Sequence, residues 1–87
     1  MTAQVCVLYF AKSAELTGVK EEEIVAVPTP ISCRDLWRLL LQRHPRLSVL
    51  QDQVVLAVCQ QYVAIGDQVV TLADGDEVAV VPPLSGG

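Results

Sequence analysis

The segment Gln4–Phe10 places the strongest constraint on the fold, because from Val5 onward it is apolar at every position. Its β-branched and aromatic residues are typical of a β-strand. Alternate residues of a strand face opposite sides of the sheet. One side would carry Val5, Val7 and Tyr9, and the other would carry Cys6, Leu8 and Phe10. A strand that is apolar on both sides belongs in the centre of a sheet, or has a partner on its second face.

The size and charge of the chain exclude several classes of protein. Its 87 residues suffice for one domain, and 18% charged residues is too few for a disordered chain. A net charge of −4 leaves no basic patch for nucleic acid or anionic lipid. The longest apolar run, Val5–Ala11, is far shorter than the ~20 residues that cross a bilayer, and no signal peptide is visible. We therefore expect a soluble domain that binds neither nucleic acid nor membrane.

Two helices are predicted between the strands. Residues 12–17 form a short helix, with Ser13 as a candidate N-cap and Gly18 as a left-handed stop. The main helix starts at Ser32, which fits a capping box, and ends before Pro45. Its apolar positions follow the helical period, so this helix packs on the core. They are Leu36, Trp37, Leu39, Leu40 and Leu41.

The remaining apolar segments alternate with turn residues and predict further strands. Turns are expected at Gln60–Gln61, at Gly66–Asp67 and at Ala73–Asp76. The strands that they separate span residues 21–27, 54–59, 62–65, 68–72 and 77–81. In the last strand, Val78 and Val80 would face the core. These elements describe an α+β domain with a mixed sheet around one main helix. If the first and last strands are neighbours in its centre, the order is that of the β-grasp fold.

The three cysteines indicate neither a disulfide framework nor a metal site. Cys6, Cys33 and Cys59 are odd in number, widely spaced and lack a Cys-x-x-Cys pair. Apolar neighbours make each of them a candidate for a small buried residue. The single histidine, His44, lies at the predicted helix end, so we expect neither a metal centre nor a Cys–His pair. Unpaired cysteines favour a reducing compartment, the cytosol.

After the last strand the sequence reads Pro82-Pro83-Leu84-Ser85-Gly86-Gly87. Two prolines cannot continue a central strand, so a stiff, extended exit is expected here. Gly86 and Gly87 have no side chains and could enter a narrow channel. A frayed end or a cloning remnant is an alternative. The direct junction with a strand favours a chain end that presents the Gly87 carboxylate.

A glycine carboxylate becomes reactive once it is activated. As an acyl-adenylate it is a good electrophile, and glycine offers little hindrance to the attacking nucleophile. Attack by a lysine amine would give an isopeptide, whereas attack by persulfide sulfur would lead to a thiocarboxylate. In either case Gly87 would be the reacting residue, and the folded domain would position it.

Three segments resemble those of a known family: residues 7–11 (Val-Leu-Tyr-Phe-Ala), residues 13–18 (Ser-Ala-Glu-Leu-Thr-Gly) and residues 75–87, from Gly-Asp-Glu-Val to Pro-Pro-Leu-Ser-Gly-Gly. With them, the chain resembles the ubiquitin-like sulfur carriers of the MoaD and ThiS type, and among these the small subunits of eukaryotic molybdopterin synthases. The likeness extends over nearly the whole chain. It implies an α+β, ubiquitin-like β-grasp fold over residues 1–82 and a flexible Gly-Gly tail over residues 83–87.

The resemblance implies a carrier that has no catalytic residues of its own. An activating enzyme of the ubiquitin-E1-like type would adenylate Gly87, and a rhodanese-type persulfide would convert it to a thiocarboxylate. The tail would then enter the large, catalytic subunit in a complex of two large and two small subunits. There its sulfur would attack the cyclic pyranopterin monophosphate precursor and help to build the dithiolene of molybdopterin. Neither a bound cofactor nor a metal is implied, since the adenylate comes from ATP.

The resemblance also assigns residues to roles. Gly87 would carry the sulfur, and the tail beside it would include Gly86, Ser85 and Leu84. The interface with partners would include Phe10, Leu8, Tyr62, Val81 and Pro82. Phe10 could instead belong to the core. Many relatives have an aromatic residue just before the two prolines, where this chain has Val80 and Val81.

Three other functions remain open. A protein modifier joined to lysines through Gly87 would usually have a basic residue before Gly-Gly, where this chain has Ser85. A thiamin-pathway sulfur carrier would share the chemistry and serve another enzyme. An interaction module with an incidental tail is the third alternative. The acidic residues at 21–23, 74, 76 and 77 would mostly form a solvated face, with a lesser role in steering basic partners.

Overall fold

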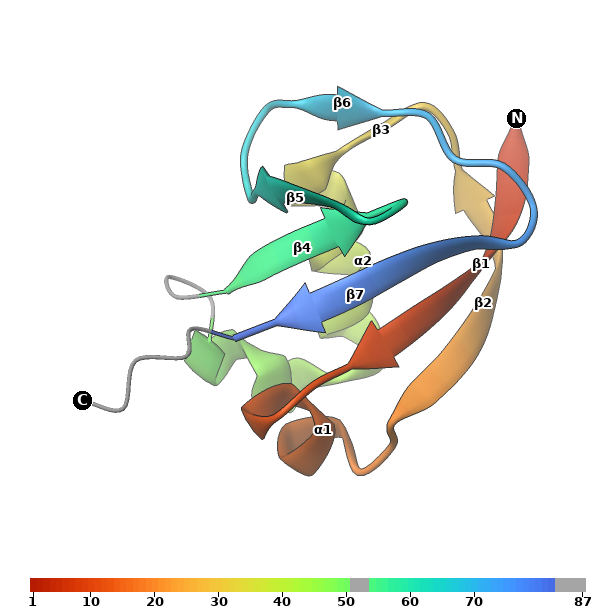
Figure 1. Ribbon diagram of the computed structural model, residues 1–87. Helices are drawn as coiled ribbons and strands as arrows, with labels where there is room; N and C mark the ends of the chain where they lie inside the picture. The colour runs from red at the N-terminus through yellow and green to blue at the C-terminus, as the bar shows by residue number, and fades with distance from the viewer. Residues whose placement is uncertain (51–53, 83–87) are drawn as a thin grey trace.

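A computed structural model describes residues 1–50 and 54–82, and these residues form two sheets (Figure 1). The larger sheet has the strand order β2-β1-β7-β4-β5, and the smaller one pairs β3 with β6. The strands are β1 (Thr2–Tyr9), β2 (Glu21–Pro28), β3 (Ile31–Ser32), β4 (Val55–Val58), β5 (Gln61–Ala64), β6 (Val69–Val70) and β7 (Asp76–Val81). The helices are α1 (Lys12–Thr17), α2 (Cys33–Arg43) and the 3₁₀ helix η1 (Pro45–Leu50).

The first and last strands of the fold are neighbours inside the sheet, which meets the condition set for the β-grasp order, and the interior position of β1 agrees with its two apolar sides. They run parallel, with Val5 opposite Asp76 at one end and Tyr9 opposite Val80 at the other. β2 and β4 flank this pair in antiparallel register. The predicted α+β class with the β-grasp strand order is therefore confirmed.

The inner side of the sheet packs on α2, which lies behind the sheet in Figure 1. The buried side chains of this core include Val5, Val7, Tyr9, Leu36, Trp37, Leu40, Leu56, Val78 and Val80. The predicted inward positions of β7, Val78 and Val80, are thus confirmed, and the core side of β1 is the one with Val5, Val7 and Tyr9. None of the helices in residues 1–50 and 54–82 has the length and apolarity needed to span a bilayer.

Helix α2 starts and ends where the sequence predicts. The Ser32 hydroxyl oxygen accepts a 3.1 Å hydrogen bond from the backbone N–H of Asp35 and so caps the first turn. His44 is the C-terminal cap, and Pro45 follows it. The chain then continues as η1, which was not predicted from the sequence, and buries Leu47 and Leu50 in the core.

The strand predicted over residues 68–72 is shorter than expected. Only Val69–Val70 forms a strand, and it pairs with β3, which was not predicted. The backbone N–H of Leu72 donates a 2.8 Å hydrogen bond to the Thr29 hydroxyl, so a side chain replaces the strand ladder there. A two-residue strand of this kind depends on a distant partner, and alternation within one segment does not reveal it.

The turn between β4 and β5 lies one residue earlier than predicted. Cys59 and Gln60 occupy it, with φ angles of 52° and 69°, as a two-residue hairpin turn requires. Cys59 is consequently exposed, so its prediction as a buried residue is wrong, whereas Cys33 is buried as expected. Cys6 is intermediate, and all three thiols are free.

A carboxylate on β2 connects β1 to the end of α2. The Tyr9 hydroxyl donates a 2.6 Å hydrogen bond to Oε1 of Glu22, and Nε2 of His44 lies 2.6 Å from the same oxygen. Nη2 of Arg43 lies 3.3 Å from the other carboxylate oxygen. Burial by itself would raise the pKa of Glu22, but the hydrogen bonds from Tyr9, His44 and Arg43 outweigh burial and lower this pKa. Burial, and then the bond to Glu22, raise the pKa of Tyr9, so its phenol stays protonated.

Replacing Glu22 with glutamine should make the free energy of unfolding depend less on pH in the acid range. The folded pKa of Glu22 lies below the unfolded value of about 4.3. Its ionisation therefore stabilises the native state above about pH 5, and this contribution is lost as the pH falls through the folded pKa. At neutral pH we expect Glu22→Gln to lower the free energy of unfolding by about 1.5–3 kcal/mol, the range for hydrogen bonds to a charged group. Urea denaturation across the acid range measures both effects.

Glu15→Gln is the matched control. Glu15 pairs with Lys12 at 3.5 Å on exposed helix surface, where an ion pair contributes at most about 1 kcal/mol. Equal losses in the two variants, or an unchanged acid slope in Glu22→Gln, would contradict a stabilising role for the Glu22 network.

Candidate functional site

The parallel pairing of β1 and β7 places the exit of the chain beside the turn that follows β1. Both strands end at the same edge of the sheet, and the backbone N–H of Phe10 donates a 3.3 Å hydrogen bond to the carbonyl of Val80. Pro82, the last described residue, is buried at this edge. The predicted carrier residue Gly87 and the tail residues Leu84, Ser85 and Gly86 lie outside the described residues.

Ser13 fastens the two strand ends together. It is fully buried, and its hydroxyl donates a 2.6 Å hydrogen bond to the carbonyl of Phe10 and lies 3.3 Å from the carbonyl of Val80. The prediction of Ser13 as the N-cap of α1 is therefore wrong. Ala11 is the N-cap, with a φ of 51° and no side-chain hydrogen bond. Ser13 lies inside α1, and its hydroxyl faces the carbonyls of Phe10 and Val80. Gly18 ends α1 with a φ of 80°, as predicted.

The outer side of the sheet, away from α2, carries a row of small and apolar residues. Leu8 pairs with Ala79, Ala79 with Ala57, and Ala57 with Tyr62. Paired residues share a face, so this row crosses four strands. Val55 pairs with Val81 on the same side, at the end of β7. We call the surface made by these residues and Phe10 the outer apolar face: Leu8, Phe10, Val55, Ala57, Tyr62, Ala79 and Val81.

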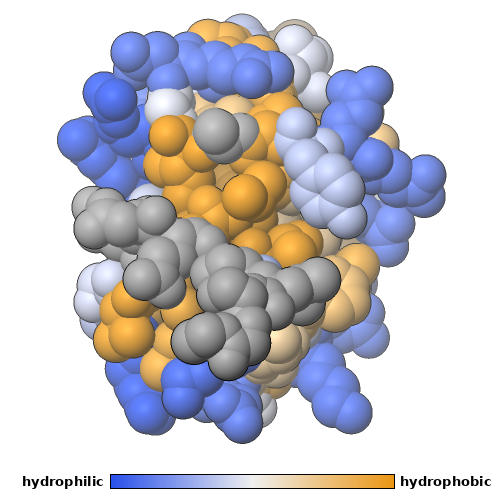
Figure 2. Space-filling model, turned by 60° about the vertical axis from the view of Figure 1, so that its left-hand side comes forward, coloured by the Kyte–Doolittle hydropathy of each residue, from blue (hydrophilic) through white to orange (hydrophobic). Residues whose placement is uncertain are grey.

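Figure 2 shows apolar residues gathered in one area on the side of the molecule where β1 and β7 end, with hydrophilic residues around it. Phe10 is 49% exposed and Tyr62 is 74% exposed. The alternative of Phe10 as a core residue is therefore wrong. Leu8 and Val81 are half-buried. Exposed apolar area of this kind marks interaction surfaces in soluble proteins.

Four of the residues predicted at a partner interface thus lie together on one face, and their contact with a partner stays a prediction. They are Leu8, Phe10, Tyr62 and Val81. Three residues that complete the face were not predicted from the sequence: Val55, Ala57 and Ala79. Alternation in β4 and β7 could have identified them, because each lies on the opposite side from a buried neighbour.

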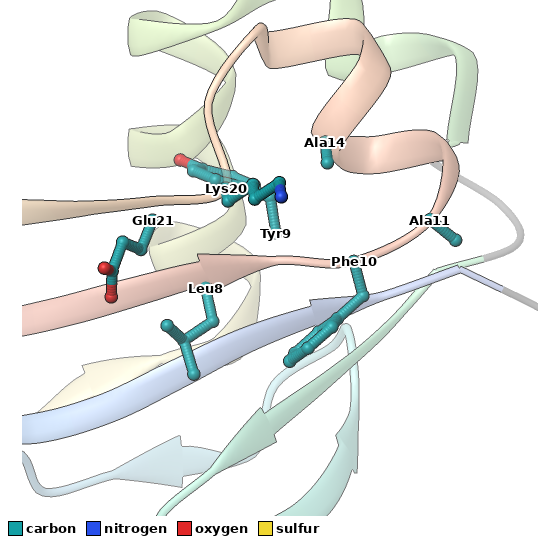
Figure 3. A pocket seen from close by; sticks show the side chains of 7 residues that line it. All are labelled: Leu8, Tyr9, Phe10, Ala11, Ala14, Lys20 and Glu21. Carbon is teal, nitrogen blue, oxygen red and sulfur yellow. The ribbon is translucent and has the colours of Figure 1, made fainter.

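A pocket of about 440 Å³ lies at the corner of this face, between β1, α1 and the start of β2 (Figure 3). Figure 3 shows Leu8 and Phe10 on the outer side of β1, while Tyr9 points to the other side. The residues that line the pocket are Leu8, Tyr9, Phe10, Ala11, Ala14, Lys20 and Glu21. The pocket is mostly apolar, so it suits an apolar side chain of a partner.

The thiols are not activated for nucleophilic chemistry. Burial, followed by the negative charges of Glu21, Glu77 and Glu23, raises the pKa of Cys6. Burial raises the pKa of Cys33, and burial and then Asp76 raise that of Cys59. A raised pKa keeps a thiol protonated at neutral pH. In the part of the chain that the structure describes, no three His, Cys, Asp or Glu side chains are grouped so as to hold a metal ion.

Comparison with known proteins decides the family. Residues 7–87 match the ThiS family. This chain belongs to the ThiS family. Among curated relatives of this chain, the human molybdopterin synthase sulfur carrier subunit is 54% identical over 84 residues. The match covers 97% of this chain and 94% of the relative. The subunit of that name from Chlamydomonas reinhardtii is 43% identical, over 97% of this chain and 99% of the relative.

Solved structures of similar proteins share the fold of the ThiS-family chain. A protein described as molybdopterin converting factor, subunit 1, from Pyrococcus furiosus is 35% identical with a TM-score of 0.75, covering 95% of this chain and all of that one. Small archaeal modifier protein 1 from Haloferax volcanii is 26% identical with a TM-score of 0.75, covering 94% and 99% of the two chains.

Replacing Ser13 with alanine should loosen the junction between β1 and β7. The substitution removes the buried hydroxyl that donates a hydrogen bond to the Phe10 carbonyl. We therefore expect the free energy of unfolding to fall by about 1–2 kcal/mol. Urea denaturation measures the loss. Thr17→Val is the matched control, because the Thr17 hydroxyl bonds the Val19 carbonyl at an exposed site on the same helix. A loss for Ser13→Ala no larger than that of the control would count against this anchoring role.

Proposed function

We propose that this chain is the sulfur carrier subunit of a molybdopterin synthase and works in molybdenum cofactor biosynthesis in the cytosol. The observation that carries the proposal is the 54% identity to the human subunit over nearly the full length of both chains. The outer apolar face beside the chain exit supports it, because a carrier needs a docking surface next to the group that it presents. The catalytic side chains belong to the large subunit.

The proposed chemistry takes place at the carboxyl group of Gly87. A carboxylate oxygen attacks the α-phosphate of ATP on an E1-like activating enzyme, so pyrophosphate leaves and an acyl-adenylate forms. Persulfide sulfur then attacks the acyl carbon and AMP leaves. A thiol cleaves the resulting acyl disulfide and releases the thiocarboxylate. Within the large subunit, in an assembly of two large and two small subunits, this sulfur attacks the cyclic pyranopterin monophosphate precursor. Water then cleaves the acyl–sulfur bond, which leaves the sulfur on the product and restores the Gly87 carboxylate.

A modifier function is the second candidate. The structural similarity to small archaeal modifier protein 1 favours it, with a TM-score of 0.75. In that case an amine of a target lysine would attack the acyl-adenylate in place of the persulfide. Ser85, which stands before Gly86-Gly87, speaks against it, because a basic residue is usual there in ubiquitin-type modifiers.

Intact mass after incubation with the activating enzyme, ATP and a sulfur source separates the two functions. We expect a gain equal to one oxygen-to-sulfur exchange, and we expect deletion of Gly87 or addition of an alanine after it to abolish the gain without unfolding the domain. Conjugates of high mass would favour the modifier. No change with an activating enzyme shown to be working would overturn both functions.

Phe10 should contribute strongly to binding of the large subunit. Phe10 is a half-exposed aromatic residue that a partner can bury, and truncation of an interface hot spot costs about 2 kcal/mol or more. We therefore expect Phe10→Ser to weaken binding about 30-fold, measured by calorimetric titration. Val25→Ser is the control, since Val25 is 68% exposed on β2 outside the outer apolar face. Equal affinities for the two variants would refute docking through this face.

A further inference from the structure

Three carboxylates border the outer apolar face, along its β2 flank and at its Cys6 end. Glu23 of β2 and Glu77 of β7 pair with Cys6 of β1 from opposite sides, and Glu21 pairs with Leu8. Paired residues point to the same face of a sheet, so the three side chains lie on the outer face around Cys6. We call Glu21, Glu23 and Glu77 the carboxylate rim.

Contacts of the rim with its neighbours confirm this placement. The Cys6 thiol lies 3.9 Å from a carboxylate oxygen of Glu21. The side-chain amide of Gln4 donates a 2.5 Å hydrogen bond to Glu23. The pKa of Cys6 is raised by burial and then by all three rim charges, so all three act on one point of the face. Three like charges at this spacing repel one another.

No ion pair among the described residues neutralises the carboxylate rim. Among the described residues, the ion pairs join Lys12 to Glu15, Arg34 to Asp67, Arg38 to Asp35, and Arg43 and His44 to Glu22. None of these pairs includes a rim carboxylate. Lys20 lines the corner pocket together with Glu21, but Figure 3 shows its side chain on the α1 side of β1, whereas Glu21 lies beside Leu8.

An apolar centre with a rim of one charge sign has a direct consequence for association. The apolar area supplies affinity, while the rim charges speed encounter and select a partner of opposite charge. An uneven distribution of charge around the face also sets orientation. Here Glu23 and Glu77 border the Cys6 end of the face and Glu21 flanks Leu8, whereas the chain exit at Val81 borders the opposite end.

We propose that the carboxylate rim docks on a basic strip of the large subunit, whose apolar surface covers the outer apolar face. The inference rests on the proposed function and specifies the partner surface: an apolar centre with lysine or arginine side chains along one side. This pairing orients the carrier so that the end of β7 points into the partner. The rim accelerates association, and the apolar face holds the complex together.

The test compares two triple variants with the same change in net charge. The rim variant is Glu21→Gln, Glu23→Gln and Glu77→Gln, and the control is Glu15→Gln, Asp35→Asn and Asp67→Asn, whose carboxylates are exposed elsewhere. Association with the large subunit is followed by stopped-flow at increasing salt. We expect the rim variant to associate about tenfold more slowly at low salt, with a shallower salt dependence, and the control to resemble the unmodified chain.

The rates of all three proteins should converge at high salt, because screening removes the steering. If both variants associate with the large subunit equally slowly, net charge explains the effect and the proposal is overturned. It is also overturned if neither variant associates more slowly than the unmodified chain. The proposal is overturned as well if the rim variant associates more slowly with the activating enzyme but not with the large subunit, because the rim would then serve that enzyme. Circular dichroism and urea midpoints verify that both variants fold. Failure of the unmodified chain to bind the large subunit at any salt would instead refute the proposed function.

Discussion

The parallel pairing of β1 with β7 is the constraint on which the rest of the molecule depends. The two strands are far apart in the sequence, and their contact closes the centre of the sheet. Because parallel strands end at the same edge, the chain leaves β7 beside the turn that follows β1. The buried Ser13 hydroxyl holds that turn against the strand ends. The same pairing brings residues of β1 and β7 into one row on the outer side, so the docking surface and the exit have a common origin.

The charges of the chain are divided between stability and recognition. Glu22 is partly buried and receives hydrogen bonds from Tyr9, His44 and Arg43, which fasten the inner side of the sheet to the end of α2. Its neighbours Glu21 and Glu23 face the other side of the same strand and have no cation partner among the described residues. Successive acids on one strand therefore act on opposite faces. A strand with alternating sides makes this division possible.

Periodicity predicted the parts of the fold that are decided locally. The inward positions of β7 follow from alternation, and the start of α2 follows from the capping serine, Ser32. Predictions failed where a contact distant in the sequence or the exact register of a hairpin decides. Ser13 has the residue type of an N-cap, but its hydroxyl bonds strand ends that only the fold brings near. Cys59 looked like a buried residue because of its apolar neighbours, yet it occupies a turn with positive φ.

The sequence by itself determined the fold class, the family resemblance and the candidate carrier residue Gly87, because strand alternation, helix period and the Pro-Pro to Gly-Gly pattern are local properties of the chain. Tertiary structure decided which residues become neighbours across strands. Two features depend on the register of the five strands of the larger sheet. One is the row from Leu8 to Tyr62, and the other is the grouping of the three rim carboxylates around Cys6. Register arises from the packing of the whole core, since a shift of one residue would turn every side chain of a strand to the opposite face.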